Sequence, residues 1–308
     1  MLVSFIIPTF NSERTIKECL ESIKEQKCKK EIIVVDGDSH DRTKEIVKEI
    51  TKKLIIEKRK GIAVARNTGL RNAEGKYIAF VDSDVVLPKS WLTKALKLLR
   101  SDERIAAVGG PGLSPEKSLV SKSLNSLLFG HSSLIERKFV DSLATMDVLY
   151  KKRDIQGMFF DESMFAGEDP EFNFRLRKKN LRLLYDRELW VYHYHPTNFK
   201  GLFKKWYNYG KSYPLLGYKH KELRNIRFYV RLLYMPLFFI LIFSSLFFHH
   251  SIYLACLQIL IIFFYYSNIG IKTCRGFVLL AFPFIHTSKQ ISHMLGHIVG
   301  LITLLIRK

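Results

Sequence analysis

Residues 77–84 read YIAFVDSD, an apolar run that ends directly on two acids, Asp82 and Asp84. A short apolar run without polar alternation predicts a strand buried on both faces, as in a parallel sheet covered by helices. The two acids then lie at the carboxyl end of that strand. Because ligands bind beyond the carboxyl ends of the strands in such sheets, the same stretch also predicts the position of a site.

The sequence before this strand repeats a pattern of strand followed by helix. Predicted strands span residues 2–7, 31–36 and 54–56, and apolar helical faces follow at 16–23, 46–50 and 62–72. This alternation predicts an α/β fold in which helices cover both faces of a mostly parallel sheet. Asp36 ends the second predicted strand as Asp82 ends the fourth, so their carboxylates can converge on one crevice.

Asp82 and Asp84 form a pair that suits a hard divalent cation. Mg²⁺ and Mn²⁺ prefer carboxylate oxygens and commonly share them with the phosphates of a substrate. A solvated turn at the end of a strand would contain the same residue types. The pair alone leaves both interpretations open, and the surrounding sequence has to decide between them.

That surrounding sequence resembles the family 2 glycosyltransferases. Residues 61–69 (GIAVARNTG) and 73–84 (AEGKYIAFVDSD) are similar to the most recognisable stretch of the family, and further matches follow the expected order. They are FIIPTFN at 5–11, VVDGDSHDRT at 34–43, FDE at 160–162 and AGED at 166–169. The resemblance, over residues 3 to about 185, implies a GT-A fold and inverting transfer of a sugar from a nucleotide diphosphate donor.

The resemblance also implies roles for individual residues. The nucleotide-sugar would contact Pro8, Thr9, Asn11, Asp36, Arg66 and Asp82. Asp84, together with Asp82, would ligate Mg²⁺ or Mn²⁺ as a cofactor, and Asp169 would be the catalytic base. Glu168 and Trp206 would lie on the acceptor side. The chemistry agrees, since a diphosphate leaving group needs its charge neutralised and an acceptor hydroxyl needs a carboxylate to take its proton.

Asp169 has a second role open to it. It precedes Pro170 and a predicted helix, and Asp at the N-cap with Pro at the first helical position is a common helix start. Capping and proton transfer are compatible with each other. The family resemblance favours the base.

A His-x-His pair, His193 and His195, follows a predicted strand at 189–192. Either imidazole would add a metal ligand beside the acids, and the alternative is a histidine that only packs at the strand end. Residues 204–206 (KKW) resemble the Gln-x-x-Arg-Trp motif of the processive polysaccharide synthases only loosely, because the glutamine is absent. We therefore expect one sugar to be added in each encounter.

The C-terminal third combines positive charge with long apolar runs. Residues 200–231 carry nine Lys or Arg and one acid, while the runs 232–248 and 251–271 contain no charge. Each run is long enough for a transmembrane helix, and the flanking Lys and Arg residues predict a hairpin with both ends in the cytoplasm. We expect a catalytic domain at 1–197, amphipathic interfacial helices at 198–231 and a transmembrane region at 232–308.

The last segment, 276–306, is interrupted by Pro283 and by a polar run at 286–289. Proline and polar side chains both disfavour an uninterrupted span. We expect an interfacial or re-entrant segment here, followed by a short span from about Ile291 to 306.

The net charge of +20 lies largely beside the apolar runs, which favours anionic lipid headgroups over nucleic acid as the partner. The four cysteines show no metal-binding or disulfide spacing, so we expect free thiols in a reducing compartment. The first residues lack the basic region of a signal peptide. We expect an integral, multi-pass membrane protein whose catalytic domain faces the cytoplasm.

The sequence therefore predicts a metal-dependent, inverting glycosyltransferase that moves one sugar from a nucleotide-diphosphate sugar to a lipid-linked or membrane-proximal hydroxyl. A polyprenyl-phosphate glycosyl synthase is the near alternative, because an acceptor phosphate is already an anion and needs no base. A nucleotidyltransferase is more distant. It shares a similar sheet and acid pair but normally carries a Gly-rich pyrophosphate loop, where this chain has residues 8–11 (PTFN).

Overall fold

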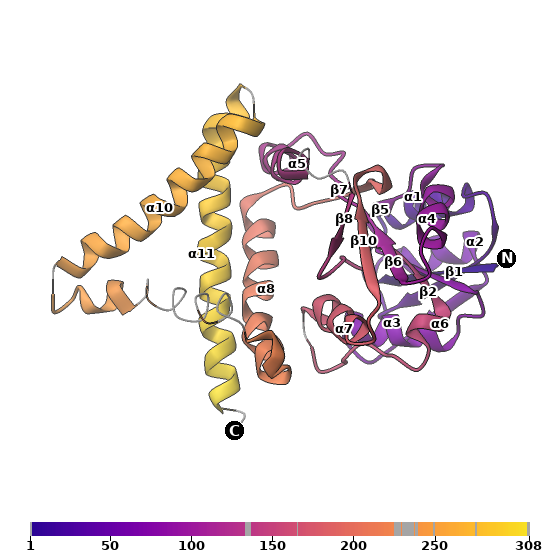
Figure 1. Ribbon diagram of the computed structural model, residues 1–308. Helices are drawn as coiled ribbons and strands as arrows, with labels where there is room; N and C mark the ends of the chain where they lie inside the picture. The colour runs from indigo at the N-terminus through magenta and orange to yellow at the C-terminus, as the bar shows by residue number, and fades with distance from the viewer. Residues whose placement is uncertain are drawn as a thin grey trace. The chain divides into compact units, whose positions relative to one another are not determined.

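The computed structural model describes residues 2–132, 137–164, 166–224, 229, 237, 240–248, 250–274 and 276–306. It divides into two compact units (Figure 1). The first contains Met1–Pro115 and Leu134–Tyr194, and the second contains Glu116–Ser133 and His195–Lys308. Residues 116–133 therefore group with the second unit, although they lie within the predicted catalytic domain 1–197.

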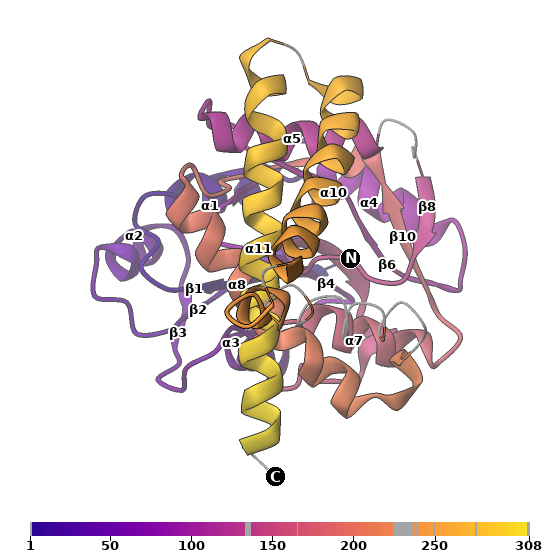
Figure 2. The same cartoon turned by 90° about the vertical axis from the view of Figure 1, so that its left-hand side faces the viewer.

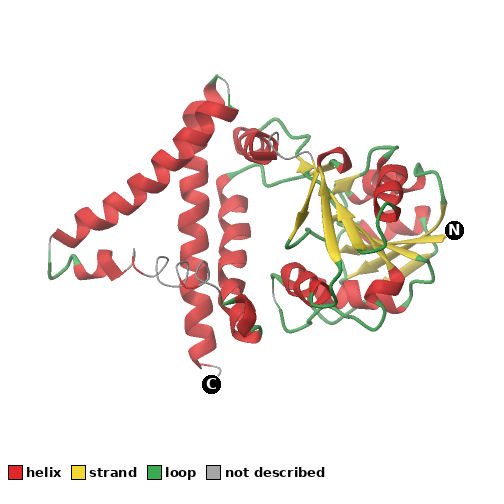
Figure 3. Cartoon of the chain, in the orientation of Figure 1, coloured by secondary structure: helices red, strands yellow, loops and turns green. Residues whose placement is uncertain are grey.

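A large central sheet organises the first unit (Figure 3). Its eight strands, in spatial order, are β3 (Lys53–Ile56), β2 (Lys29–Asp36), β1 (Leu2–Thr9), β4 (Tyr77–Val81), β9 (Asp147–Lys151), β6 (Ile105–Gly109), β10 (Arg182–Asp186) and β8 (Arg137–Val140). The first four are mutually parallel, β9 is antiparallel to both of its neighbours, β6 and β10 are parallel, and β8 is antiparallel. The predicted α/β fold is confirmed.

Helices cover both faces of this sheet because successive strand residues point to opposite sides. Phe5 of β1 belongs to a core shared with helices on one face, and Ile6 belongs to a second core shared with helices on the other. The first set is α1 (Ile16–Lys24), α2 (Thr43–Ile50) and α4 (Trp91–Arg100), and the second is α3 (Ile62–Arg71), α6 (Lys152–Ile155) and α7 (Glu168–Arg177).

A small second sheet lies in the order β5 (Val85–Val86), β11 (Val191–His193) and β7 (Gly112–Leu113). A 3-10 helix, η1 (Arg187–Leu189), precedes β11. The strand predicted at 189–192 therefore starts later than expected, because the residues after Asp186 first complete a helical turn that the Asp186 side chain caps. As a result, His193 is the last residue of β11 instead of following it.

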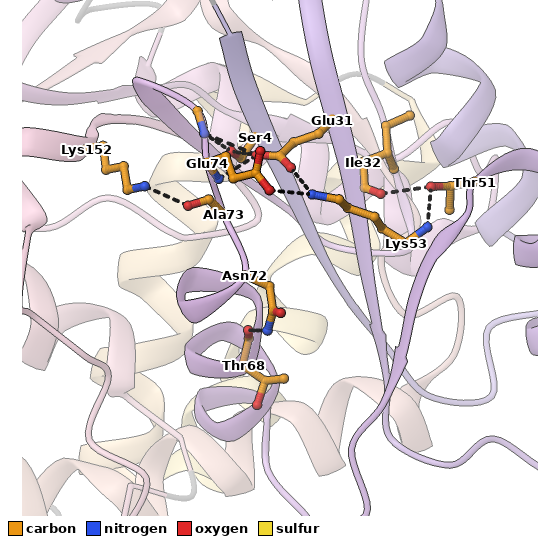
Figure 4. Close-up of polar contacts among 11 residues, drawn as sticks. Ser4, Glu31, Ile32, Thr51, Lys53, Thr68, Asn72, Ala73, Glu74 and Lys152 are labelled. Carbon is orange, nitrogen blue, oxygen red and sulfur yellow. Dashed lines mark hydrogen bonds and ion pairs between the residues drawn. The ribbon is translucent and has the colours of Figure 1, made fainter.

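A polar network joins the amino ends of the parallel strands, opposite the end where the acids lie (Figure 4). The Glu31 carboxylate on β2 accepts hydrogen bonds from the Ser4 hydroxyl on β1, from Lys53 Nζ on β3 and from the amides of Glu74 and Gly75. The Gly75 amide also donates to Ser4 Oγ at 2.7 Å. One carboxylate thus ties three strands to the turn that leads into β4.

Gly75 leaves no room for a side chain. A Cβ there would lie 2.6 Å from the backbone nitrogen of Ser4 and 2.6 Å from its Oγ. We expect Gly75→Ala to lower the melting temperature in detergent, through a loss of about 1–3 kcal/mol of unfolding free energy from the forced displacement of β1. Lys76→Ala, at the exposed neighbouring position, is the control. Equal melting temperatures for the two variants would contradict this account of the turn.

The second unit is helical in the part that the structure describes. It contains α5 (Leu119–Ser132), α8 (Phe199–Lys219), the 3-10 helix η2 (Lys221–Leu223), α10 (His250–Thr273) and α11 (Phe277–Ile306). α8 falls within the region predicted as amphipathic interfacial helices, 198–231, and its place in a membrane interface stays a prediction. Within the predicted span 232–248, the structure describes residue 237 and residues 240–248, with helix at 240–244 and a turn at 245–247, and the other residues of the span lie outside the described residues.

α8 and α11 run side by side in Figure 1, and α11 overlaps α8 in the turned view of Figure 2, so the two helices pack directly against each other. A Cβ at Gly210 would lie 2.0 Å from the carbonyl oxygen of His293, and one at Gly296 would lie 2.0 Å from the oxygen of Tyr207. Gly300 meets the oxygen of Lys211 in the same way, at 2.2 Å. A four-residue spacing of glycines, as at Gly296 and Gly300, is typical of a helix that packs closely against another helix. Here the other helix is α8.

Two helices, α10 with 24 residues and α11 with 30, are long and apolar enough to cross a membrane. α11 differs from the prediction because it is one helix without the break expected before Ile291. The polar run 286–289 does not interrupt it, since His286 and Lys289 are buried within the unit and His286 Nε2 lies 3.3 Å from the Ser123 carbonyl. Neighbouring helices similarly allow Pro283 inside the helix.

Candidate active site

A buried arginine gathers three carboxylates at the carboxyl end of β4. The Arg66 side chain, 2% exposed, donates from Nη2 to Asp82 Oδ1 at 3.0 Å. Its Nη1 donates to Glu168 Oε1 at 2.6 Å and to Asp169 Oδ1 at 2.9 Å. These residues come from α3, the end of β4 and the first turn of α7. The structure therefore brings together four of the predicted site residues.

The position of α3 follows from its small residues. A Cβ at Gly69 would lie 2.2 Å from Ile6 Cγ2, so the helix lies directly against β1. Ala63 and Ala65 are buried in the same core. The N-cap, Gly61, has a φ of 133°, which only glycine adopts readily and which directs the chain into the helix. This position of α3 places the Arg66 side chain at the carboxyl end of the sheet, in contact with the three acids.

Asp169 is held by residues from two other segments. Its Oδ1 accepts from Arg66 and from the Thr145 hydroxyl, and its Oδ2 accepts from the Thr145 amide at 3.2 Å. The predicted N-cap role is wrong, because Gly167, at a φ of 81°, is the N-cap and Asp169 is the second helical residue. Because Gly167 takes the left-handed conformation, the helix begins at Glu168, before the start that the Asp-Pro pair predicted. The side chain is 22% exposed, so it remains accessible.

Burial and mutual repulsion shift the protonation of this cluster. Burial, together with the charge of Asp169, raises the pKa of Glu168 to about 7, although Arg66 opposes the shift. Burial also raises the pKa of Asp82, with Arg66 lowering it and Asp84 raising it further. One guanidinium thus faces three carboxyl groups. The excess of negative charge favours a bound proton or a cation at this end of the sheet.

Asp84 lies beside His193 on the small sheet. Its Oδ2 is 3.4 Å from His193 Nε2, and its carbonyl accepts from the Tyr194 amide at 3.0 Å. His193 pairs with Val85 in the antiparallel ladder between β11 and β5, which fixes this approach. The Asp84 side chain is 38% exposed. Among the described residues, no group of three or more His, Cys, Asp or Glu side chains is arranged to hold a metal ion by itself.

The loops after β1 and β2 interlock at the same end of the sheet. Both carboxylate oxygens of buried Asp36 accept from Ser39, from its amide and its hydroxyl, at 2.7 Å each. Ser39 Oγ in turn accepts from the Asn11 amide at 2.8 Å, and Asn11 Oδ1 accepts from the His40 amide at 2.9 Å. Asp36 therefore shapes the loop that carries Asn11.

Thr9 and Pro8 end β1 beside this loop. The Thr9 hydroxyl is buried and has no hydrogen-bond partner among the residues that the structure describes. A buried polar atom without a partner is uncommon in folded proteins. Its position at the carboxyl end of the strand is consistent with contact to a ligand.

His195 and Trp206 belong to the second unit. Trp206 lies in α8, where its ring faces Lys289 Nζ at 4.1 Å from the ring centroid.

The sequence did not reveal two residues of the site, Thr145 and Asp147. Asp147 begins β9 opposite Val81 and accepts from the Gly110 amide at 3.2 Å. Burial raises its pKa well above the ordinary range, and the charge of Asp82 adds to the shift. In the sequence, Thr145 and Asp147 are simply a Thr and an Asp on either side of Met146. This pattern indicates a site only once β9 is known to lie antiparallel to β4.

The motif order and this geometry agree with comparisons to known proteins. The family described as Glycosyl transferase family group 2 matches residues 77–269, and the one described as Glycosyl transferase family 2 matches residues 4–146. The chain belongs to the family 2 glycosyltransferases. The resemblance found in the sequence is confirmed, and the protein is a glycosyltransferase.

Two relatives of this glycosyltransferase have stated substrates. A Methanococcus voltae protein is 28% identical over 240 residues, covering 70% of this chain and 73% of that protein. It is a dolichyl N-acetyl-α-D-glucosaminyl phosphate 3-β-D-2,3-diacetamido-2,3-dideoxy-β-D-glucuronosyltransferase. An Escherichia coli protein, WfgD, is a UDP-Glc:α-D-GlcNAc-diphosphoundecaprenol β-1,3-glucosyltransferase, 40% identical over 102 residues, or 32% of this chain and 39% of that protein.

A solved structure supports the GT-A fold. The mannosyltransferase PcManGT from Pyrobaculum calidifontis, in complex with GDP-Man and Mn²⁺, superimposes with a TM-score of 0.64 at 17% identity. The superposition covers 97% of this chain and 86% of that one. Some relatives are much longer, since the chain spans only 30% of GlyA from Streptococcus pneumoniae.

The raised pKa of Glu168 makes stability depend on pH. Between about pH 4.5 and 7 the folded protein holds a proton on Glu168 that the unfolded chain releases, so this contribution is lost as the pH rises through that range. In the wild type we expect the unfolding free energy to fall by an amount on the order of 1–3 kcal/mol between pH 5 and 7.5 because of this group. In Glu168→Gln this decrease should be absent. Thermal unfolding at both pH values measures it, with the exposed Glu49→Gln as control. Parallel profiles for the variants and the wild type would contradict the assignment.

Proposed function

We propose that this glycosyltransferase is metal-dependent and inverting, and that it moves one sugar from a nucleotide-diphosphate sugar to a hydroxyl of a lipid-linked or membrane-proximal acceptor. The observation that carries the proposal is the placement of Asp169, partly exposed and held by Arg66 and Thr145 in the same cluster as Asp82. Inverting transfer needs one carboxylate of this kind within hydrogen-bond reach of the attacking hydroxyl, on the side of the anomeric carbon opposite the leaving diphosphate.

Asp169 is the proposed base because one of its oxygens keeps capacity to accept a proton. Oδ1 already accepts from Arg66 and from the Thr145 hydroxyl, whereas the described partner of Oδ2 is the Thr145 amide alone. A carboxylate oxygen has two lone pairs, so Oδ2 can also accept the acceptor hydroxyl. The bonds from Thr145 and Arg66 fix the orientation of the carboxylate before substrate binds.

The donor site is proposed at the ends of β1, β2 and β4. Pro8, Thr9, Asn11 and Asp36 would hold the nucleotide, and the buried Thr9 hydroxyl supports that role. Asp84 and Asp82 would hold Mg²⁺ or Mn²⁺, because such ions bind through one or two carboxylates together with substrate phosphates and need no complete protein cage. The bound cation would neutralise charge that develops on the diphosphate. His193 would orient Asp84 or add a ligand.

The acceptor is proposed to carry a lipid. The relatives from Methanococcus voltae and Escherichia coli are named for dolichyl phosphate and diphosphoundecaprenol acceptors, and the chain has two helices that suit a membrane. We propose that α10 and α11 anchor the protein in the membrane, that membrane lipids are partners, and that the first unit faces the cytoplasm. Glu168 and Trp206 remain proposed acceptor-side residues.

Replacing Asp169 tests the base. We expect Asp169→Asn to lower kcat by roughly 10²–10⁴-fold with a hydroxyl acceptor, because the amide cannot take the proton. UDP or GDP binding should stay near the wild-type value. Release of nucleoside diphosphate from a panel of UDP-, GDP- and dTDP-sugars, by the full chain in detergent with Mn²⁺, measures the rate. Asp102→Asn, remote in the turn before β6, is the matched control.

The outcome also separates two acceptor classes. Near-complete loss supports a hydroxyl acceptor. Retained activity of Asp169→Asn with a polyprenyl phosphate would contradict the base and favour the polyprenyl-phosphate glycosyl synthase, whose nucleophile is already ionised.

The proposed cation site makes a separate prediction. We expect EDTA to abolish turnover, Mn²⁺ or Mg²⁺ to restore it, and Asp84→Asn to lower kcat/KM by roughly two orders of magnitude. The reason is that a neutral amide holds a divalent cation far less well than a carboxylate. Titration of the metal at fixed donor concentration measures both effects, with Asp102→Asn again as the control. Full turnover in EDTA would contradict metal dependence.

A further inference from the structure

The second unit is a strongly cationic body. Residues 116–133 and 195–308 contain 16 Lys or Arg and only two acids, Glu116 and Glu222. Of these cations, the ones that the structure describes are exposed or half-buried, with one exception. Lys289 is 7% exposed and lies in the middle of α11.

Lys289 faces aromatic rings instead of a counterion. Its Nζ lies 4.1 Å from the centroid of the Trp206 ring and 6.0 Å from that of Tyr266. It makes no ion pair and no hydrogen bond with any residue that the structure describes. Aromatic faces offset only part of the cost of removing an ammonium from water. An anion brought by another molecule would offset the rest of that cost.

The surroundings of Lys289 are polar and extend along one face of α11. His286, Lys289, His293 and His297 follow at intervals of three or four residues, the spacing that places side chains on one side of a helix. Both ring nitrogens of His297 and Nδ1 of His286 are buried without a partner among the described residues. His286 directs Nε2 at the Ser123 carbonyl, which leaves its Nδ1 as an acceptor. The His297 ring keeps an N–H without a partner among the described residues, and phosphate oxygens accept such hydrogen bonds.

We propose that Lys289, with Trp206 beside it, binds the phosphate of a lipid-linked acceptor. An ionisable residue within a membrane-crossing segment generally marks a substrate path, and its partner here has to be an anion. A phosphate or diphosphate ester is the anion that a lipid-linked acceptor carries. This inference rests on the proposed lipid-linked acceptor and adds the residue that recognises its charged group.

The test uses the full chain in detergent and two probes, farnesyl phosphate and farnesol, which differ only in the phosphate. We expect the wild type to bind the phosphate more tightly than the alcohol. Lys289→Gln should weaken farnesyl phosphate binding by roughly tenfold or more and leave farnesol binding unchanged. Lys289→Arg, which keeps the charge, should retain the preference. Lys272→Gln removes one exposed charge from the same unit and serves as the matched control.

Three outcomes would overturn the proposal. Equal wild-type affinity for the two probes would mean that the phosphate is not recognised. Equal losses in Lys289→Gln and Lys272→Gln would indicate diffuse attraction to a basic unit. Competition by phosphatidylglycerol in nanodiscs as effective as that by unlabelled farnesyl phosphate would assign the site to bulk anionic lipid. Melting temperatures of all variants identify any that fail to fold, and Lys289→Arg keeps the test decisive in that case.

The binding assay needs no sugar transfer. Failure of the transfer reaction with every donor would therefore leave the phosphate preference measurable. Conversely, loss of the preference would leave the Asp169 and Asp84 experiments unaffected.

Discussion

The buried guanidinium of Arg66 is the interaction on which the first unit depends. Without a cation between them, the carboxyl groups of Asp82, Glu168 and Asp169 would repel one another. Two of them are adjacent in the chain and the third is almost ninety positions earlier, so a single side chain joins α3, the end of β4 and the start of α7. Removing it would leave buried like charges uncompensated, which is far more damaging than losing a surface ion pair.

The three acids around Arg66 differ in burial and in protonation. Glu168, the most buried of the three, gains a proton near neutral pH. Asp169 and Asp82 are more exposed and lie at the edge of the cluster. The arrangement therefore keeps two carboxyl groups accessible, while the proton on Glu168 limits the total charge. A site that binds a diphosphate and a hydroxyl needs both features, because the diphosphate adds negative charge and the hydroxyl has to give up a proton.

Much of this could be predicted from local sequence, and most of the failures come from contacts between residues distant in the chain. The first four strands are continuous apolar runs, so their positions and the α/β fold follow from pattern alone. β9 carries Asp147 and Lys151 at its ends, and both are buried by contacts that no local pattern shows. The start of α7 was misplaced because Gly167 takes a left-handed φ and starts the helix two residues before Asp169. The polar run in α11 resembled a break because its burial depends on other helices. For β9 and α11, partners distant in sequence decide the outcome, whereas the start of α7 is decided locally.

The contact between α8 and α11 limits how the protein can be recombined. Gly210, Gly296 and Gly300 each face a carbonyl oxygen of the opposite helix, so the two backbones fit each other as a matched pair. A chimera that took only its last helix from a related enzyme would bring a side chain into one of those positions unless the donor had glycine there too. The unit that can be exchanged is therefore discontinuous in sequence. α8 and α11 would have to be transplanted together, although a long segment of chain separates them.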